Sequence, residues 1–305
     1  MKMAVIGGAG LLGSTSAFLA GMKGYLEEIK LIDIKENLVK NHVLDMGQAV
    51  YGSSKTKISY GEYEDLSDCG IILLTASMPE RKVADRMEYL WDNMKLILPI
   101  CEKIKANCKE AVLINATNPV DIFNYIIWKK LGWKREKVLG FNGNDTYRLK
   151  WAVSSVTGKE FSKINGFSIG EHGNGQINLY DKMTYLNKPL NLSEVEIKQV
   201  EDITSNFFVK FSALDCGRTS GWCSAVNIEE LIEAVATNSG KVLECSSVLD
   251  GEYGLSGISL GMPVVVGNSG IKGYTDLELT AEQKDRLEQV AEGMKEVLKK
   301  CNIDF

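Results

Sequence analysis

KMAVIGGAGLLGSTSAFLAG, residues 2–21, joins a short apolar run to a glycine-rich turn and then to an apolar helical pattern. Within this stretch Gly8, Gly10 and Gly13 have the spacing GxGxxG. Asp33 follows 20 residues after Gly13, at the end of the next strand-like run. A strand, this glycine spacing, a helix and a later acid together predict a βαβ unit that binds a dinucleotide.

The glycine-rich turn is suited to hold a pyrophosphate. Gly8 permits a tight turn, Gly10 lets backbone N–H groups approach the phosphates, and Gly13 allows the helix to pack closely on the strand. Leu11 and Leu12 belong to the same cofactor-binding set, because they open the helix where its dipole favours an anion. The alternative is a tight turn that binds no ligand.

Asp33 bears on the choice of dinucleotide. Its carboxylate can accept hydrogen bonds from ribose hydroxyls, and it would repel a 2′-phosphate. NAD is therefore favoured over NADP as the cofactor, although Lys35 lies close by with the opposite charge. If the turn binds no ligand, Asp33 is instead a helix cap.

The chain as far as residue 143 alternates strand-like and helix-like segments. The strand-like runs are KMAVIG (2–7), IKLIDI (29–34), KISY (57–60), CGIILLTA (69–76), AVLINAT (111–117) and KVLGF (137–141). Helix-length segments separate most of them, as in a parallel sheet that is covered on both faces. This predicts an α/β fold with a doubly wound parallel sheet, a Rossmann domain over residues 1–143 that binds NAD.

The pattern changes in residues 144–305, which we expect to form a mixed α+β catalytic domain. Residues 161–190 resemble antiparallel strands or hairpins, and helices are expected near 193–213 and 225–239. Strands follow at KVLECSSVLD (241–250) and GMPVVVGNSG (261–270), and a charged amphipathic helix closes the chain. Thr280 is its expected N-cap, with Gln283 completing a capping box.

Composition excludes several classes of protein. The 305 residues carry a net charge of −5, and the sequence pI is near 5.4, which argues against a nucleic-acid partner. No signal peptide, transit peptide or apolar run of membrane-spanning length is present, so we expect a cytoplasmic protein without a membrane partner. The seven cysteines are scattered without metal-site spacing, which favours buried thiols and predicts no metal site.

Four polar residues are candidates for chemistry at the carboxyl edge of the sheet or beyond it. Asn118 ends the fifth strand-like run, before Pro119. His172 lies between a strand and glycines in SIGEHGNG, where a neutral imidazole could exchange a proton near neutral pH. Asp145 and Arg148 are three apart and share a helix face. Each has a plain alternative: a turn residue, a turn histidine, or a surface ion pair.

Taken in order, several short motifs make the chain resemble the lactate/malate dehydrogenase family. They are GAGLLG, LID, TAS followed by a loop and Arg86, NATNP, NDTYR, GEHG and GMPVVVGNSGIKG, in register over essentially the whole chain. The resemblance implies an NAD-dependent 2-hydroxy acid dehydrogenase that works as a homodimer or homotetramer. Its partner is a small 2-oxo or 2-hydroxy acid.

The resemblance also implies a role for each candidate. His172 is the general acid/base, and Asp145 orients its imidazole. Arg148 binds the substrate carboxylate, and Arg86 arrives on a closing loop and polarises the reacting oxygen. Asn118 hydrogen-bonds near the substrate and the nicotinamide. Besides Asn118 and the glycine-rich turn, the expected cofactor-binding residues include Thr75 and Ala76.

The substrate side chain is less clear from the sequence. In the family, the loop before the Arg86 position selects the substrate, with arginine for malate and typically glutamine for lactate. Alignment without gaps between Ala76 and Arg86 places Glu80 there, and a carboxylate favours a cationic or hydrogen-bond-donating side chain. Two alternatives remain. A shift of one residue would place Arg81 in the pocket and select malate, or Glu80 would point away from the substrate.

Three function classes therefore compete. The leading one is a 2-hydroxy acid dehydrogenase, either with the unusual substrate that Glu80 suggests or as an ordinary malate or lactate dehydrogenase. An NAD-using glycosidase would need metal ligands, and the sequence has only two histidines. An inactive NAD(H)-sensing module would not need His172, Asp145, Arg148 and Arg86.

Overall fold

The computed structural model describes residues 1–78, 86–216 and 220–301, and for residues 86–88, 208 and 212 the backbone alone. Six parallel strands run in the order β3-β2-β1-β4-β5-β6. Their bounds are β1 Lys2–Ile6, β2 Glu28–Ile32, β3 Lys57–Tyr60, β4 Ile71–Leu74, β5 Val112–Asn115 and β6 Val138–Phe141. All six predicted strands are therefore confirmed, each a little shorter than its apolar run or equal to it.

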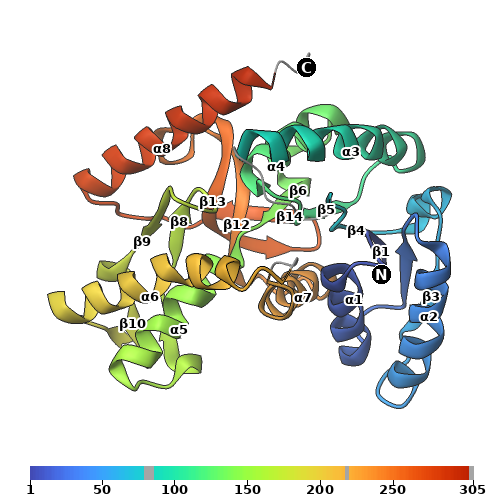
Figure 1. The fold of residues 1–305 in the computed structure, drawn as a ribbon, viewed down its shortest axis with the longest axis horizontal. Helices are drawn as coiled ribbons and strands as arrows, with labels where there is room; N and C mark the ends of the chain where they lie inside the picture. The colour runs from blue at the N-terminus through green and yellow to red at the C-terminus, as the bar shows by residue number, and fades with distance from the viewer. Residues whose placement is uncertain (79–85, 217–219, 302–305) are drawn as a thin grey trace.

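The helices of this half are α1 Leu11–Lys23, α2 Glu36–Tyr51, α3 Arg86–Asn107 and α4 Val120–Leu131. Figure 1 shows α3 and α4 above the parallel strands, and α1 below them beside α7 (Trp222–Ala236). Helices thus cover both faces of the sheet, as the doubly wound prediction requires. The arrangement is built from apolar strands that are buried on both sides.

The sheet continues into the second half of the chain through antiparallel strands. β12 (Val242–Asp250) pairs with β6, and the order runs on through β13 (Ser256–Gly267), β8 (Ser168–Gly170) and β9 (Gln176–Asn178). β14 (Gly270–Tyr274) pairs with β13. The sequence analysis missed β14 and the first part of β13, because SGIS and GIKGY lack an apolar run. Although the sheet continues across both halves, we propose that the boundary between the two domains falls near residue 143, where α5 (Gly143–Thr157) begins.

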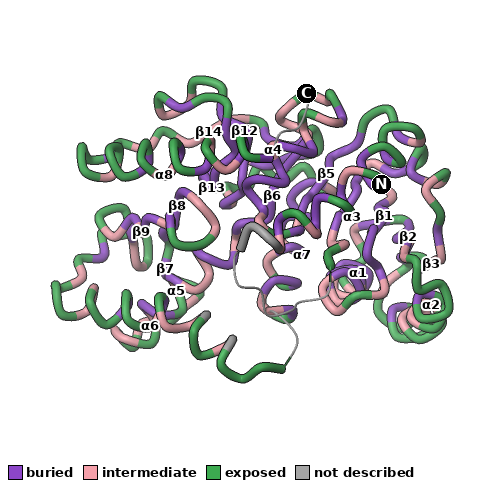
Figure 2. Tube along the Cα trace, turned by 45° about the horizontal axis from the view of Figure 1, so that its top comes forward, coloured by how far each residue is buried: buried purple, intermediate pink, exposed green. Residues whose placement is uncertain are grey.

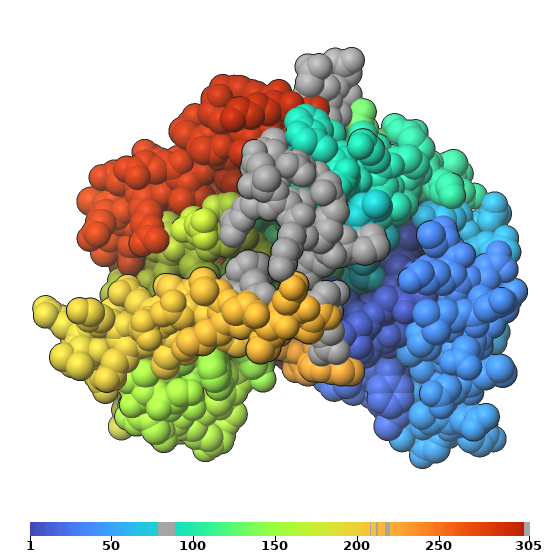
Figure 3. All heavy atoms as spheres, viewed as in Figure 1, coloured from blue at the N-terminus to red at the C-terminus, as the bar shows by residue number. Residues whose placement is uncertain are grey.

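Two neighbouring helices and a small sheet also belong to the second half of the chain. α5 (Gly143–Thr157) packs along α6 (Glu194–Ala213), as Figures 1 and 3 show. A three-stranded sheet combines β7 (Ile164–Asn165), β10 (Thr184–Tyr185) and β11 (Lys188–Pro189). Short 3-10 helices lie at Tyr63–Asp68, Arg135–Lys137, Phe161–Lys163, Tyr180–Lys182 and Glu252–Gly254.

The closing helix is α8 (Ala281–Lys300), and its predicted capping box is confirmed. Thr280 Oγ1 accepts a hydrogen bond from Gln283 N at 3.2 Å, and Gln283 Oε1 accepts one from Thr280 N at 3.0 Å. These two bonds satisfy donors that the first helical turn otherwise leaves open.

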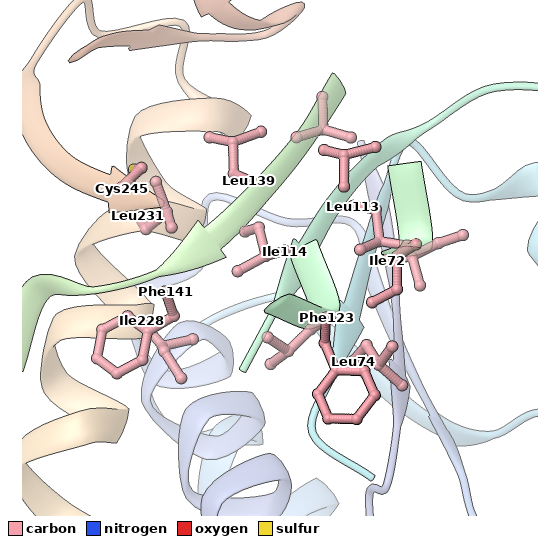
Figure 4. Packing of buried hydrophobic residues seen from close by; sticks show 14 of the residues in the cluster. Ile72, Leu74, Leu113, Ile114, Phe123, Leu139, Phe141, Ile228, Leu231 and Cys245 are labelled. Atoms are coloured by element: carbon pink, nitrogen blue, oxygen red, sulfur yellow. The ribbon is translucent and has the colours of Figure 1, made fainter. Parts of the chain in front are cut away.

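One large hydrophobic core crosses from the parallel strands into the second half. Figure 4 shows side chains from β4, β5, β6, α4, α7 and β12 meeting in it, including Leu74, Ile114, Phe123, Ile228 and Cys245. In Figure 2 the buried residues concentrate in the strands, whereas the outer sides of α2 and α8 are exposed. The packing of this core therefore fixes the positions of the carboxyl ends of the central strands.

Two remaining predictions concern the surface. Five of the cysteines are buried, as expected, but Cys216 is exposed and Cys223 is half-buried, so the prediction of buried thiols was wrong for these two. Within residues 1–78, 86–216 and 220–301, no helix is both long and apolar enough to cross a membrane.

Candidate active site

The glycine-rich turn joins β1 to α1 at the carboxyl edge of the sheet. Gly7 has a φ of +96°, and a Cβ added to Gly8 would lie 2.9 Å from the Leu31 Cβ. The left-handed turn position is thus Gly7, whereas Gly8 is required for close approach to β2. A Cβ on Gly13 would lie 2.5 Å from the Gly7 carbonyl oxygen, so Gly13 must be glycine for α1 to begin here.

The first turn of α1 has the features of an anion site. Gly10 is its N-cap, and no side chain in the described part of the protein caps the helix. Gly10 is exposed, and Leu11 and Leu12 are half-buried. The N–H groups of a first turn have no partner within the helix. They therefore remain available to phosphate oxygens, with the helix dipole in their favour.

Asp33 lies beside this turn, immediately after β2. Its Oδ2 accepts a hydrogen bond from Ala9 N at 3.1 Å, and its Oδ1 accepts one from Lys35 N at 3.0 Å. These bonds fix the carboxylate next to the glycine-rich turn, and each oxygen keeps a second lone pair for a ribose hydroxyl. His42, the second histidine of the sequence, is half-buried on α2, with Nε2 3.4 Å from the Ala9 carbonyl oxygen.

The next strand ends bring Thr75, Ala76 and Asn118 to the same edge. Thr75 Oγ1 donates toward the carbonyl oxygens of Ile6 at 3.2 Å and Gly7 at 3.3 Å, so it packs directly against the glycine-rich turn. The carbonyl oxygen of Ala76 accepts a hydrogen bond from Thr117 Oγ1 at 2.8 Å. This hydrogen bond connects the segments after β4 and β5. At this edge of the sheet, the nicotinamide of a bound dinucleotide would lie next to its pyrophosphate.

Asn93 on α3 is a residue that the sequence analysis missed. It is fully buried, and its side chain bridges two strand-end loops. Its Oδ1 accepts from Met78 N at 2.8 Å, and its Nδ2 donates to the Asn118 carbonyl oxygen at 2.9 Å. An asparagine within an amphipathic helix gives little signal in the sequence, because only the fold shows which loops it reaches.

Asp145 and His172 form the expected pair. Asp145 lies in the first turn of α5 and is 2% exposed, and His172 follows β8. The Asp145 Oδ2 atom lies 2.8 Å from His172 Nδ1. Burial lowers the pKa of His172, but the charge and hydrogen bond of Asp145 outweigh it, and the net pKa lies above the ordinary histidine value. This histidine therefore holds a proton more readily than a free imidazole.

Arg148 completes a cluster with this pair. It lies three residues after Asp145 on α5, and its Nη1 is 3.4 Å from Asp145 Oδ1. Its guanidinium carbon lies 4.5 Å from the centroid of the Phe207 ring on α6. The aromatic face fixes the cation without occupying its N–H donors, which leaves the guanidinium able to bind a carboxylate.

Two more buried acids surround the pair, and the sequence analysis named neither. Asp121 is in the first turn of α4, and burial raises its pKa to about 7, although hydrogen bonds from Ser246 and the His172 main chain oppose the rise. Glu244 on β12 accepts from Thr146 N at 3.1 Å and from the Thr146 hydroxyl. Burial raises the pKa of Glu244 well above its ordinary value, and the charge of Asp145 adds to the rise.

The loop that motivated the substrate prediction is outside the described residues. Glu80 and Arg81 both fall within residues 79–85. Arg86 is the first residue of α3, but its side chain is not among those described. The predictions for Glu80, Arg81 and Arg86 therefore stay predictions.

The residues that are described fit NAD. The turn has the close glycine packing, the uncapped helix start and the fixed carboxylate that a dinucleotide needs. No group of three or more His, Cys, Asp or Glu side chains in the described part of the chain could hold a metal ion.

Comparisons with known proteins agree with this geometry. Residues 1–140 match the family model for the lactate/malate dehydrogenase NAD binding domain, and residues 144–303 match the one for the lactate/malate dehydrogenase alpha/beta C-terminal domain. The malate dehydrogenase of Aeropyrum pernix is 30% identical over 301 residues, with 97% of each chain covered. The L-lactate dehydrogenase of Acetivibrio thermocellus is 28% identical in an alignment 312 positions long, which covers 99% of this chain and 98% of that one.

A solved structure extends the likeness to three dimensions. The malate dehydrogenase of Aeropyrum pernix superposes with a TM-score of 0.90 at 30% identity, over 98% of both chains. The resemblance drawn from the sequence motifs, and the fold class expected from it, are confirmed. This chain belongs to the lactate/malate dehydrogenase family.

Proposed function

We propose that this protein is an NAD-dependent 2-hydroxy acid dehydrogenase, which transfers a hydride between nicotinamide and a 2-hydroxy or 2-oxo acid. The observation that carries the proposal is the buried contact between Asp145 and His172, with Arg148 beside it on α5. An acid/base, its orienting carboxylate and a cation for the substrate carboxylate are the groups that this reaction needs. NAD supplies the hydride acceptor when it is bound.

His172 carries the proton. Because Asp145 accepts a hydrogen bond from Nδ1, the other ring nitrogen is the one that faces substrate. In the oxidation direction Nε2 takes the hydroxyl proton as the hydride leaves the carbon. In the reduction direction the imidazolium returns that proton to the carbonyl oxygen, and Asp145 stabilises the charged ring meanwhile.

Arg148 orients the substrate. Its planar guanidinium can bind both oxygens of a carboxylate, and the Phe207 ring at 4.5 Å restricts its position. We assign Asn118 to the adjacent edge, where it faces nicotinamide and substrate together. Arg86 is assigned to polarise the reacting oxygen.

Gly8, Gly10, Leu11, Leu12 and Gly13 are assigned to the pyrophosphate. Asp33 is assigned to the adenosine ribose, where its charge disfavours NADP. Thr75 and Ala76 are assigned to the path between the pyrophosphate and the nicotinamide, which is supported by the Thr75 contacts with Ile6 and Gly7.

For the substrate side chain we keep the hypothesis that Glu80 faces it. A carboxylate there favours a polar or cationic 2-oxo acid over oxaloacetate. The names of the relatives, malate and L-lactate dehydrogenase, support an ordinary substrate instead. Under that alternative Arg81 selects a second carboxylate, or Glu80 does not reach the pocket.

We also propose that the protein is a homodimer or homotetramer. Exposed apolar side chains on α2 support this, including Leu44 at 70% exposure and Tyr51 at 88%. Light scattering coupled to size-exclusion chromatography measures the mass directly, and a monomer would refute the proposal.

The experiment that tests the function is NADH oxidation with a panel of 2-oxo acids. The panel contains pyruvate, oxaloacetate, and acids with neutral polar and cationic side chains, at matched concentrations. Preference for the polar or cationic acids supports Glu80, and preference for oxaloacetate supports Arg81. Preference for pyruvate leaves Glu80 without a role, and the absence of activity on all of them would favour an NAD(H)-sensing module.

A further inference from the structure

Asp121 is a buried carboxylate for which the proposed reaction gives no role. It lies in the first turn of α4, three residues after Asn118, and is 1% exposed. A buried ionisable group without a matched partner is costly to the fold, so its contacts bear directly on why it is present. The start of a helix is one of the few places where the dipole offsets part of this cost.

The contacts of Asp121 lead to the candidate acid/base. Its Oδ2 accepts a hydrogen bond from the main-chain N–H of His172 at 2.7 Å, across 51 residues of sequence. Its Oδ1 accepts from the hydroxyl of Ser246 on β12. The Ser246 Oγ lies 2.9 Å from the Ser259 Oγ, which accepts from Asn124 Nδ2 at 2.9 Å. This network anchors Asp121 to α4, β12 and β13.

The segment that carries His172 depends on such an anchor. Gly170 has a φ of +96° and Gly173 a φ of +152°, so a glycine in an unusual conformation lies on each side of the histidine. Glycine permits many other backbone conformations, and a side-chain contact at Nδ1 alone would let the main chain pivot. The hydrogen bond from His172 N to Asp121 removes that freedom.

We propose that Asp121 is a positioning residue for the reaction, which fixes the His172 main chain and places a second negative charge behind its imidazole. This inference rests on the proposed function. His172 is thereby held from two helices, through its ring by Asp145 on α5 and through its main chain by Asp121 on α4.

The charges around the two groups set the direction of the effect. His172 faces Asp145 and Asp121, which favour the imidazolium, and Arg148, which opposes it. Asp121 itself faces His172, Glu171 and Glu244. Because burial raises the pKa of Asp121 to about 7, its carboxylate is charged mainly above that pH. Under those conditions, removing the charge of Asp121 lowers the pKa of His172 while the other groups stay in place.

The test is the pH profile of kcat/KM for 2-oxo acid reduction by Asp121→Asn. Asparagine can keep both contacts, because its oxygen accepts from His172 N and its amide donates to Ser246, while the charge is lost. Pyruvate and oxaloacetate are both tried, and the faster one is used throughout. Since reduction needs the imidazolium, the alkaline limb should move to lower pH by about one unit.

Ser259→Ala is the matched control. It removes a hydroxyl from the same network without touching Asp121, and its profile should overlay that of the wild type. If Asp121→Asn does not fold, Ser246→Ala replaces it. Losing the Ser246 hydrogen bond makes Asp121 harder to ionise, so a smaller shift in the same direction is expected.

A uniform loss of kcat with an unmoved alkaline limb would overturn the proposal, because it would give Asp121 a structural role alone. NADH binding, followed by fluorescence, shows independently whether each variant is folded. If the wild type binds NADH but reduces no 2-oxo acid, the proposed function itself fails, and that result is distinct from an unmoved limb in an active enzyme.

Discussion

The Oδ2 atom of Asp145 lies 2.8 Å from Nδ1 of His172, and this contact joins the first turn of α5 to the segment after β8. It fixes both the orientation of the ring and the nitrogen that is left for the substrate. The two residues are 27 positions apart, so the pair exists only because α5 packs against β8.

Replacing Asp145 by asparagine tests whether its charge matters. The amide keeps the size of the side chain but does not stabilise an imidazolium, so kcat/KM for 2-oxo acid reduction should fall by about 100-fold or more. NADH affinity should remain unchanged. Asp202→Asn, at an exposed acid on α6, is the control and should have wild-type activity. Equal activity in the two variants would contradict the assignment.

Replacing Arg148 by lysine tests whether the guanidinium binds the substrate carboxylate through two parallel hydrogen bonds. The charge stays but two parallel hydrogen bonds become one, so kcat/KM should fall by about 10- to 100-fold, mainly through KM. Phe207→Leu leaves the guanidinium in place without its aromatic partner and should cost about two- to fivefold. Steady-state kinetics on both variants measures this. A larger loss for Phe207→Leu than for Arg148→Lys would place the carboxylate elsewhere.

Replacing Asp33 by serine tests the cofactor preference. Without the negative charge, the repulsion of a 2′-phosphate disappears and one ribose acceptor weakens. The ratio of kcat/KM for NADH to that for NADPH should fall by about tenfold or more, which corresponds to about 1.4 kcal/mol. An unchanged ratio would show that Asp33 serves only its contacts with Ala9 and Lys35.

The raised pKa of His172 predicts that kcat/KM changes with pH in opposite senses for reduction and oxidation. Reduction needs the protonated ring, so its kcat/KM should stay high past pH about 6.5 and then fall. Oxidation needs the neutral ring, so its kcat/KM should rise over the same interval. Profiles of both reactions in the same buffers measure this. Inflections below the ordinary histidine pKa would contradict the contact with Asp145 as the dominant influence.

The sequence predicted the parallel sheet well, because its strands are short runs rich in β-branched and other apolar residues, mostly separated by helix-length segments. β14 was missed because Gly270 and Gly273 interrupt it, and its pairing with β13 stabilises it from outside.

The sequence predicts a site residue where a short motif contains it. It does not predict one whose role depends on a contact with a distant part of the chain. His172 and Asp145 stand in recognisable motifs, whereas Asn93 and Asp121 are single polar residues in otherwise ordinary helices. Their importance comes from partners 25 and 51 residues away, and no local pattern encodes those distances. Gly7 was overlooked because the GxGxxG spacing begins one residue later.

The most direct test of the account compares wild type and His172→Asn in the reduction of 2-oxo acids by NADH. The variant should bind NADH with wild-type affinity and lose about 10²- to 10⁴-fold in turnover at every pH, because the residue assigned to deliver the proton is gone. Unchanged turnover in a folded, NADH-binding variant would contradict the account, since the proton would then come from another residue.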